Sequence, residues 1–134
     1  MLLNIKTGWK DLQKRSMNDI VIFVSSLNKL RELNVPFVFS DRHAYLRTVN
    51  FSSNLEDLKN IDWTILQNRD FKRDPNDPEK MDRYMAEALV FGHVPIEALI
   101  GVLCFSEERK IQLDALCREC GVTLNVAVKP GWYF

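Results

Sequence analysis

The apolar runs of this chain are all short, and this limits the folds that it can adopt. The run Ile20–Val24 has five residues, β-branched or aromatic without a polar interruption, which predicts a strand buried on both faces. A membrane-spanning helix needs about 20 apolar residues, so the sequence predicts no span. Hydrophobic residues at 46% and charged residues at 27% are ordinary values for a globular protein. We therefore expect a water-soluble chain.

Length, charge and cysteine content narrow the class further. With 134 residues, the chain suffices for one compact domain but not for two ordinary ones, so we expect a single domain over residues 1–134. Eighteen basic and eighteen acidic residues give a formal net charge of zero, so attraction to nucleic acid would require a local patch. No secretory signal is recognisable, and three cysteines are an odd number, so we expect the reducing cytoplasm.

Turn and capping residues divide the chain into short predicted elements. Residues 1–18 have no clean period, and we expect a loop or a frayed end there. Side chains that cap helix starts are Ser25 or Ser26, Asn54, Asp62 and Ser106. The predicted strands after residues 20–24 are 37–39, 100–105 and 122–128, and the predicted helices are 27–33, 55–58, 63–67, 95–99 and 106–121. This mixture predicts an α+β fold. In the last helix we expect an inward face made by Ile111, Leu113, Leu116 and Cys117.

Cys117 and Cys120 have the spacing of half a zinc site or of a redox pair. A tetrahedral zinc site needs two further ligands, and the available Cys104, His43 and His93 have no partnering spacing. The spacing therefore favours a helix end with Cys117 packed inward, and we predict no metal.

The stretch "RDFKRDPNDPEK", residues 69–80, contains two prolines and three aspartates and predicts an exposed loop. Arg69, Lys72 and Arg73 surround Phe71, a combination that suits phosphate contacts together with stacking on an unpaired base. The alternative is a solvated loop whose aspartates neutralise these charges, and spacing alone favours that alternative.

Glu87 lies in the apolar stretch "MDRYMAEALVFG", residues 81–92, and its role depends on the local structure. In a helix, Arg83 and Glu87 would form an i,i+4 ion pair, and propensity alone favours this helix. In a strand, Glu87 would share a face with Met85, Leu89 and Phe91, where a carboxylate is costly without partners. His43 follows a predicted strand, where sites often form, although a backbone-bonded turn histidine is the simpler interpretation. The residues alone leave both questions open.

Three stretches together resemble the DarT family of bacterial toxins, which are DNA ADP-ribosyltransferases paired with a macrodomain antitoxin. They are "VPFVFSDRHAY" (35–45), "IDWTILQNRDFKRDPNDPEKMDRYMAEALV" (61–90) and "GWYF" (131–134). The resemblance covers the carboxyl-terminal part of the family, whose members carry a further amino-terminal segment with a histidine and an arginine that help hold NAD. It implies an ADP-ribosyltransferase-like mixed β-sheet core with short flanking helices, which we expect to be incomplete at the amino terminus.

The resemblance also implies roles for individual residues. Glu87 takes the position of the catalytic glutamate, His43 and Arg83 match positions near the active cleft, and the loop 69–80 would contact single-stranded DNA. DNA-binding roles then fall to Arg69, Phe71, Lys72 and Arg73. NAD would be a substrate, no metal would be needed, and thymine is favoured over guanine as the acceptor base.

Three hypotheses follow from these patterns. The first is a DarT-like transferase, either active or truncated, whose other partner would be a macrodomain antitoxin. The second is a non-catalytic remnant that binds single-stranded DNA or the antitoxin. The third is a small metal-binding module built on Cys117 and Cys120.

Overall fold

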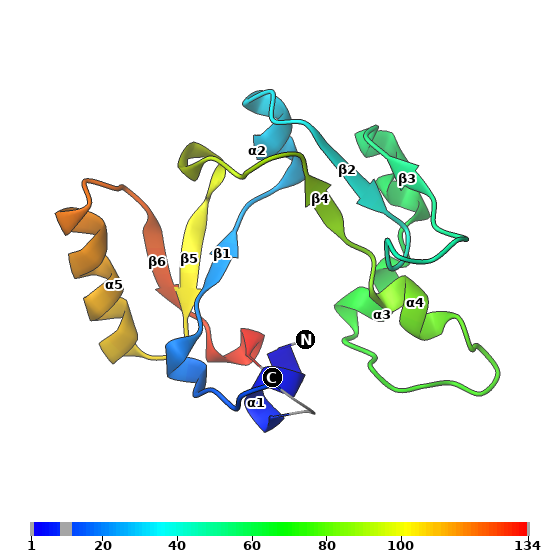
Figure 1. Cartoon of the computed structure of the whole chain (residues 1–134), viewed down its shortest axis with the longest axis horizontal. Coiled ribbons are helices and arrows are strands. Elements are labelled where there is room, and N and C mark those ends of the chain that lie inside the picture. The colour runs from blue at the N-terminus through cyan, green and yellow to red at the C-terminus, as the bar shows by residue number, and fades with distance from the viewer. Residues whose placement is uncertain (1, 9–11, 134) are drawn as a thin grey trace. The chain divides into compact units, whose positions relative to one another are not determined.

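Short strands and helices alternate along the chain, as Figure 1 shows for the computed structural model, which describes residues 2–8 and 12–133. The α-helices are α1 (Leu2–Thr7), α2 (Leu27–Glu32), α3 (Trp63–Gln67), α4 (Lys80–Tyr84) and α5 (Glu107–Glu119). The strands are β1 (Ile22–Val24), β2 (Phe37–Ser40), β3 (Phe51–Ser52), β4 (Ala88–Val90), β5 (Gly101–Cys104) and β6 (Asn125–Val128). Short 3-10 helices cover Met17–Asp19, Leu55–Asn60, Ile96–Ala98 and Pro130–Trp132. The predicted mixture of helices and strands is confirmed.

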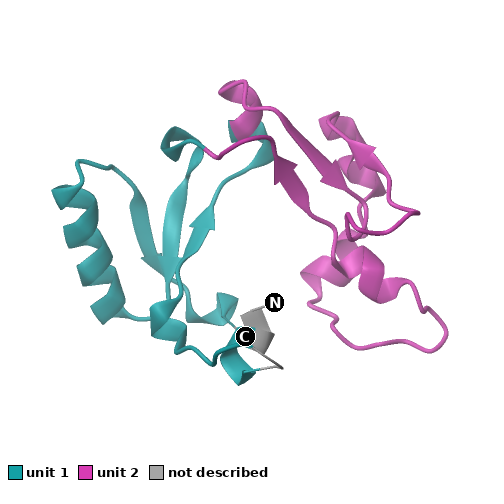
Figure 2. Ribbon diagram, in the orientation of Figure 1, with its two compact units in different colours: residues 1–29, 95–134 teal, residues 30–94 magenta. Residues whose placement is uncertain are grey.

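The chain forms two compact units, one of residues 1–29 with 95–134 and the other of residues 30–94 (Figure 2). The expectation of one domain over residues 1–134 stays a prediction. None of the helices in the described ranges has the length and apolar character that crossing a membrane requires.

The first unit is built on the sheet β1-β5-β6. The central strand β5 pairs antiparallel with β1 and parallel with β6, and α5 packs against β5 and β6. Buried residues of this unit include Val102, Cys104 and Val126. Tyr133 is fully buried, and its hydroxyl lies 2.8 Å from the Leu103 carbonyl and 3.0 Å from the Ile20 carbonyl. The "GWYF" stretch thus anchors the end of the chain to this sheet, although its Phe134 lies outside the described residues.

The second unit is built on the antiparallel sheet β3-β2-β4. Phe39 and Ser40 of β2 are buried, and Ile61 packs into the core of the same unit. The register pairs Phe39 with Ala88, so the end of β2 lies beside the start of β4. The candidate site lies at this end of the sheet.

Capping predictions agree with the structure because these bonds are local. The Lys29 N–H donates to Ser26 Oγ at 3.1 Å at the start of α2. The side chains of Asn54, Asp62 and Ser106 likewise accept N–H bonds at the starts of their helices. The last helix also ends near Gly121, whose φ of +66° is the left-handed conformation expected at a helix end.

Some predictions from the sequence are wrong. Residues 2–7 form α1 where a loop was expected, and residues 9–11 lie outside the described part. Phe23 is 60% exposed, so β1 is not buried on both faces. In α5, Ile111 is 68% and Leu116 53% exposed, while Leu113 and Cys117 are half-buried. The inward face of α5 is narrower than the apolar pattern predicts, because this helix covers only a small three-stranded sheet.

Candidate active site

Glu87 directly precedes β4 and lies beside Ser40 at the end of β2. The Ser40 N–H donates to the Glu87 carbonyl at 2.9 Å, and the Glu87 N–H lies 3.3 Å from Ser40 Oγ. Helix α4 ends at Tyr84, so the stretch 81–90 is a short helix followed by a strand. The two local structures considered for Glu87 therefore both occur in this stretch, and Glu87 lies between them, next to β4 and hydrogen-bonded to Ser40 of β2.

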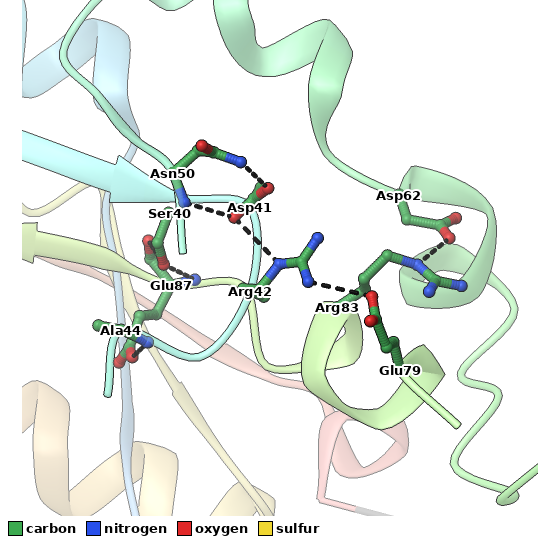
Figure 3. Close-up of polar contacts among 9 residues, drawn as sticks. All are labelled: Ser40, Asp41, Arg42, Ala44, Asn50, Asp62, Glu79, Arg83 and Glu87. Atoms are coloured by element: carbon green, nitrogen blue, oxygen red, sulfur yellow. Dashed lines mark hydrogen bonds and ion pairs between the residues drawn. The ribbon is translucent and has the colours of Figure 1, made fainter. Parts of the chain in front are cut away.

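The Glu87 carboxylate is held by the turn that follows β2. Its Oε1 accepts the Ala44 N–H at 2.9 Å (Figure 3). The same oxygen lies 3.2 Å from His43 Nδ1. The side chains of Glu87 and His43 remain 38% and 47% exposed. Among the described residues, no further hydrogen bond or ion pair of this carboxylate accompanies these two, which both use Oε1. An oriented yet accessible carboxylate can act on a bound molecule.

The turn after β2 is itself fixed by polar contacts. Asp41 accepts the Asn50 N–H at 3.0 Å and the Asn50 Nδ2–H at 2.8 Å. Burial raises the pKa of Asp41, but the hydrogen bonds from Asn50 and the neighbouring Arg42 outweigh it and lower this pKa below its usual value. Arg42 reaches Glu79 at 3.2 Å (Figure 3). The turn carrying His43 and Ala44 is therefore firmly placed.

Arg83 does not pair with Glu87, so the i,i+4 ion pair considered from the sequence is wrong. Its Nε lies 3.1 Å from Asp62, and its two terminal nitrogens lie 3.1 and 2.6 Å from the two oxygens of Asp77. Figure 3 shows the Arg83 side chain directed toward Asp62. These bonds, those from Asp77 first, raise the pKa of Arg83 above its already high usual value. The ion pair with Glu87 fails because α4 ends before a full turn connects the two residues.

The loop 69–80 presents several of the predicted DNA-binding side chains to solvent. Lys72 and Arg73 are exposed, and within the described ranges neither forms an ion pair. Phe71 packs on Tyr84, with ring centroids 4.6 Å apart and an angle of 57° between the rings. Of the loop aspartates, Asp70 pairs with Lys80 at 2.6 Å and Asp77 with Arg83. These two carboxylates therefore bind cations other than Lys72 and Arg73.

The cysteine pair lies away from any ligand set. Cys117 is half-buried at the end of α5, and Cys120 is exposed beyond it. Over residues 2–8 and 12–133, no three His, Cys, Asp or Glu side chains are grouped so that they could hold a metal ion. His93 is exposed in the segment after β4. The zinc-module hypothesis thus gains no support from this geometry.

Sequence reasoning missed some of the groups that build the site. The Ala44 amide is a backbone donor, so no side-chain pattern could announce it. Ser40 and Glu79 act through long-range contacts that only the pairing of β2 with β4 and the position of α4 create. The one available signal was the adjacency of Ala44 to His43 at a predicted strand end.

Comparison with known proteins gives the family. Residues 1–134 match the family model described as "ssDNA thymidine ADP-ribosyltransferase, DarT". The chain belongs to the DarT family. A curated relative from Escherichia coli O127:H6, named DNA ADP-ribosyl transferase, is 46% identical over 134 residues. That alignment covers 100% of this chain and 62% of the relative, so the chain spans less than two thirds of that relative's length.

Solved DarT structures have the same fold. Thermus sp. 2.9 DarT in complex with NAD+ superposes with a TM-score of 0.88 at 25% identity, covering 99% of this chain and 66% of that one. The same Thermus protein in complex with ADP-ribosylated ssDNA gives a TM-score of 0.87 at 25% identity, covering 99% and 63%. The expected family and the expected ADP-ribosyltransferase-like α+β fold are both confirmed.

Proposed function

We propose that this protein transfers ADP-ribose from NAD to a base of single-stranded DNA, with Glu87 as the catalytic carboxylate. The observation that carries the proposal is the Glu87 carboxylate, accessible and oriented by the Ala44 N–H and His43. Membership of the DarT family and the likeness to DarT structures named for NAD+ and ADP-ribosylated ssDNA support it.

The chemistry needs little beyond such a carboxylate. When the bond between nicotinamide and ribose breaks, its electron pair leaves with nicotinamide as a neutral ring, so no general acid is required. The sugar carbon becomes oxocarbenium-like, and a fixed carboxylate stabilises its positive charge. A base nitrogen then forms the new bond to this carbon, and its proton passes to Glu87. His43, in contact with the same carboxylate oxygen, helps to keep Glu87 in place.

The acceptor in this proposal is thymine in an unpaired strand. The family model's description names ssDNA thymidine and supports this choice over guanine. A single strand avoids the cost of unstacking a duplex base. Lys72 and Arg73 of the loop 69–80 would contact phosphates, together with Arg69, and Phe71 would offer an aromatic surface. By resemblance, the other partner is a macrodomain antitoxin, and the free cysteines agree with a cytoplasmic site of action.

The test is transfer from labelled NAD to thymidine-rich single strands, with thymidine-free strands as the acceptor control. The chain is assayed alone and with the amino-terminal family segment supplied. We expect Glu87→Gln to lower transfer by roughly 10²- to 10³-fold, since it removes a charge aimed at the reacting centre. Glu119→Gln is the matched control, because Glu119 is exposed at the end of α5. Undiminished transfer by Glu87→Gln would contradict the proposal.

A second candidate is a non-catalytic protein that binds single strands, favoured by the exposure of Lys72 and Arg73 in the loop 69–80. Binding that weakens with salt, survives Glu87→Gln and is accompanied by no transfer would support it. NAD would then leave the melting temperature unchanged, because a ligand raises it only by binding the folded state.

A further inference from the structure

The geometry points to Arg83 as a positioning residue, which fixes the DNA-contacting loop 69–80 relative to Glu87 without touching the substrates. This inference rests on the proposed function. It departs from the role near the cleft that the resemblance implies for Arg83, because the guanidinium is already occupied by two carboxylates.

Arg83 joins three elements. Both of its terminal nitrogens bind Asp77 of the loop, at 3.1 and 2.6 Å, and its Nε binds Asp62 at 3.1 Å. Asp62 in turn caps α3 by accepting the Ile65 N–H at 3.3 Å. A planar guanidinium bound to both oxygens of a carboxylate fixes direction as well as distance, which a lysine ammonium cannot do. Arg83 thereby ties the end of the loop to α4 and α3.

A second ion pair closes the loop at its base. Lys80 lies 2.6 Å from Asp70, so this ion pair joins the two ends of the loop 69–80. Lys80 is only 7% exposed, and a buried ammonium requires such a partner. The packing of Phe71 on Tyr84 adds an apolar contact between the loop and α4. Both the Asp70 end and the Asp77 end of the loop are therefore bound to residues of α4.

Helix α4 also supports the turn after β2, which carries His43 and Ala44. Glu79, at the start of α4, binds Arg42, and the Asp82 carbonyl accepts the His43 N–H at 3.0 Å. Glu87 follows three residues after the end of α4. The DNA-contacting loop and the carboxylate site therefore share one short helix as their support, and Arg83 is the link on the loop side.

The inference separates DNA binding from NAD binding. Releasing Asp77 loosens the end of the loop, and the bond from the Asp77 N–H to the Asp74 carbonyl at 3.1 Å passes this loosening to the neighbouring Lys72 and Arg73. The Ala44 and His43 contacts of Glu87 stay in place. We therefore expect Arg83→Ala to raise KM for the oligonucleotide about tenfold, the factor expected for losing hydrogen bonds to a charged group. KM for NAD should change less than twofold. A double-mutant cycle with Asp77→Asn should be strongly non-additive, because the two residues act as one pair.

Loop release can be measured without any activity. Trypsin cuts after Lys72 and Arg73, and mass spectrometry identifies these cuts. We expect cleavage there to be about tenfold faster in Arg83→Ala and intermediate in Arg83→Lys, which keeps the charge but not the two parallel bonds. Lys110→Ala is the matched control, since it breaks a 2.6 Å ion pair with Asp114 on α5 and should leave loop cleavage unchanged.

Each result of these experiments either supports the inference or overturns it. Faster loop cleavage with a raised oligonucleotide KM supports the inference. Unchanged cleavage in Arg83→Ala overturns the inference. A fall in kcat with both KM values unchanged also overturns it and assigns Arg83 to the reaction itself. If the wild-type protein transfers no ADP-ribose, the proposed function fails. The cleavage rates of Arg83→Ala and Asp77→Asn still show whether Arg83 holds the loop 69–80 in place.

Discussion

Ser40 shows how one small buried side chain sets the position of Glu87. Its hydroxyl is fully buried and lies 3.3 Å from both the backbone N–H and the carbonyl of Glu87. The backbone of Glu87 is thus bound by both the main chain and the side chain of one residue. The Glu87 carboxylate therefore extends from a backbone whose position is fixed.

We predict that Ser40→Ala lowers the free energy of unfolding by about 1 kcal/mol, because a buried hydrogen-bonding group then loses its partner. Urea unfolding followed by circular dichroism measures this change. Ser53→Ala, at an exposed serine of the same unit, is the control and should stay within about 0.5 kcal/mol of wild type. Equal stability of the two variants would contradict the role assigned to Ser40.

At the residue scale, the sequence predicted which side chains cap helices but not which ions pair. Asn54 and Asp62 bond to N–H groups two or three residues away, so the spacing alone contains the answer. The partners of Arg83 include a residue 21 positions earlier, and only tertiary structure brings these two together. The proposed catalytic role of Glu87 rests on the resemblance to the DarT family, because the residues alone leave its local structure open.

At the scale of elements, the junction of β5 and β6 depends on a missing side chain. A Cβ atom on Gly101 would lie 2.6 Å from the Asn125 carbonyl oxygen. Real contacts of this kind are longer, so the parallel pairing of these strands requires glycine here. The sequence showed an apolar run at residues 100–105 but gave no sign of which strand would lie beside it.

We predict that Gly101→Ala lowers the free energy of unfolding by roughly 1–3 kcal/mol, since the neighbouring backbone must move to accept the methyl group. Thermal unfolding measures the effect. Gly131→Ala is the matched control, because no atom lies within 4 Å of a Cβ built there. A Gly101→Ala protein as stable as the control would show that the two strands separate at little cost.

At the scale of the whole molecule, the buried Tyr133 makes the free energy of unfolding depend on pH in the alkaline range. Burial, followed by the nearby Cys104, raises the pKa of Tyr133 above its ordinary value of 10.0. The unfolded tyrosine therefore ionises at lower pH than the folded one. Its stabilising contribution is fully present below about pH 10 and is lost as the pH rises through the higher folded pKa.

We predict that the free energy of unfolding of wild type falls above about pH 10, and that Tyr133→Phe reduces this fall because phenylalanine cannot ionise. Chemical unfolding between pH 8 and about 11 measures both slopes. Near neutral pH, the same variant should be less stable by about 1 kcal/mol, as the Leu103 and Ile20 carbonyls lose their donor. Tyr45→Phe, at an exposed tyrosine, is the control. Identical alkaline slopes in wild type and Tyr133→Phe would refute the assignment.

The closure of the loop by Lys80 and Asp70 has an evolutionary consequence. Because the two ends are fastened to each other, the residues between them can change in length or chemistry while the base stays fixed. Under the proposed function, the contacts of the loop with neighbouring nucleotides can therefore change by substitution while Glu87 keeps its position.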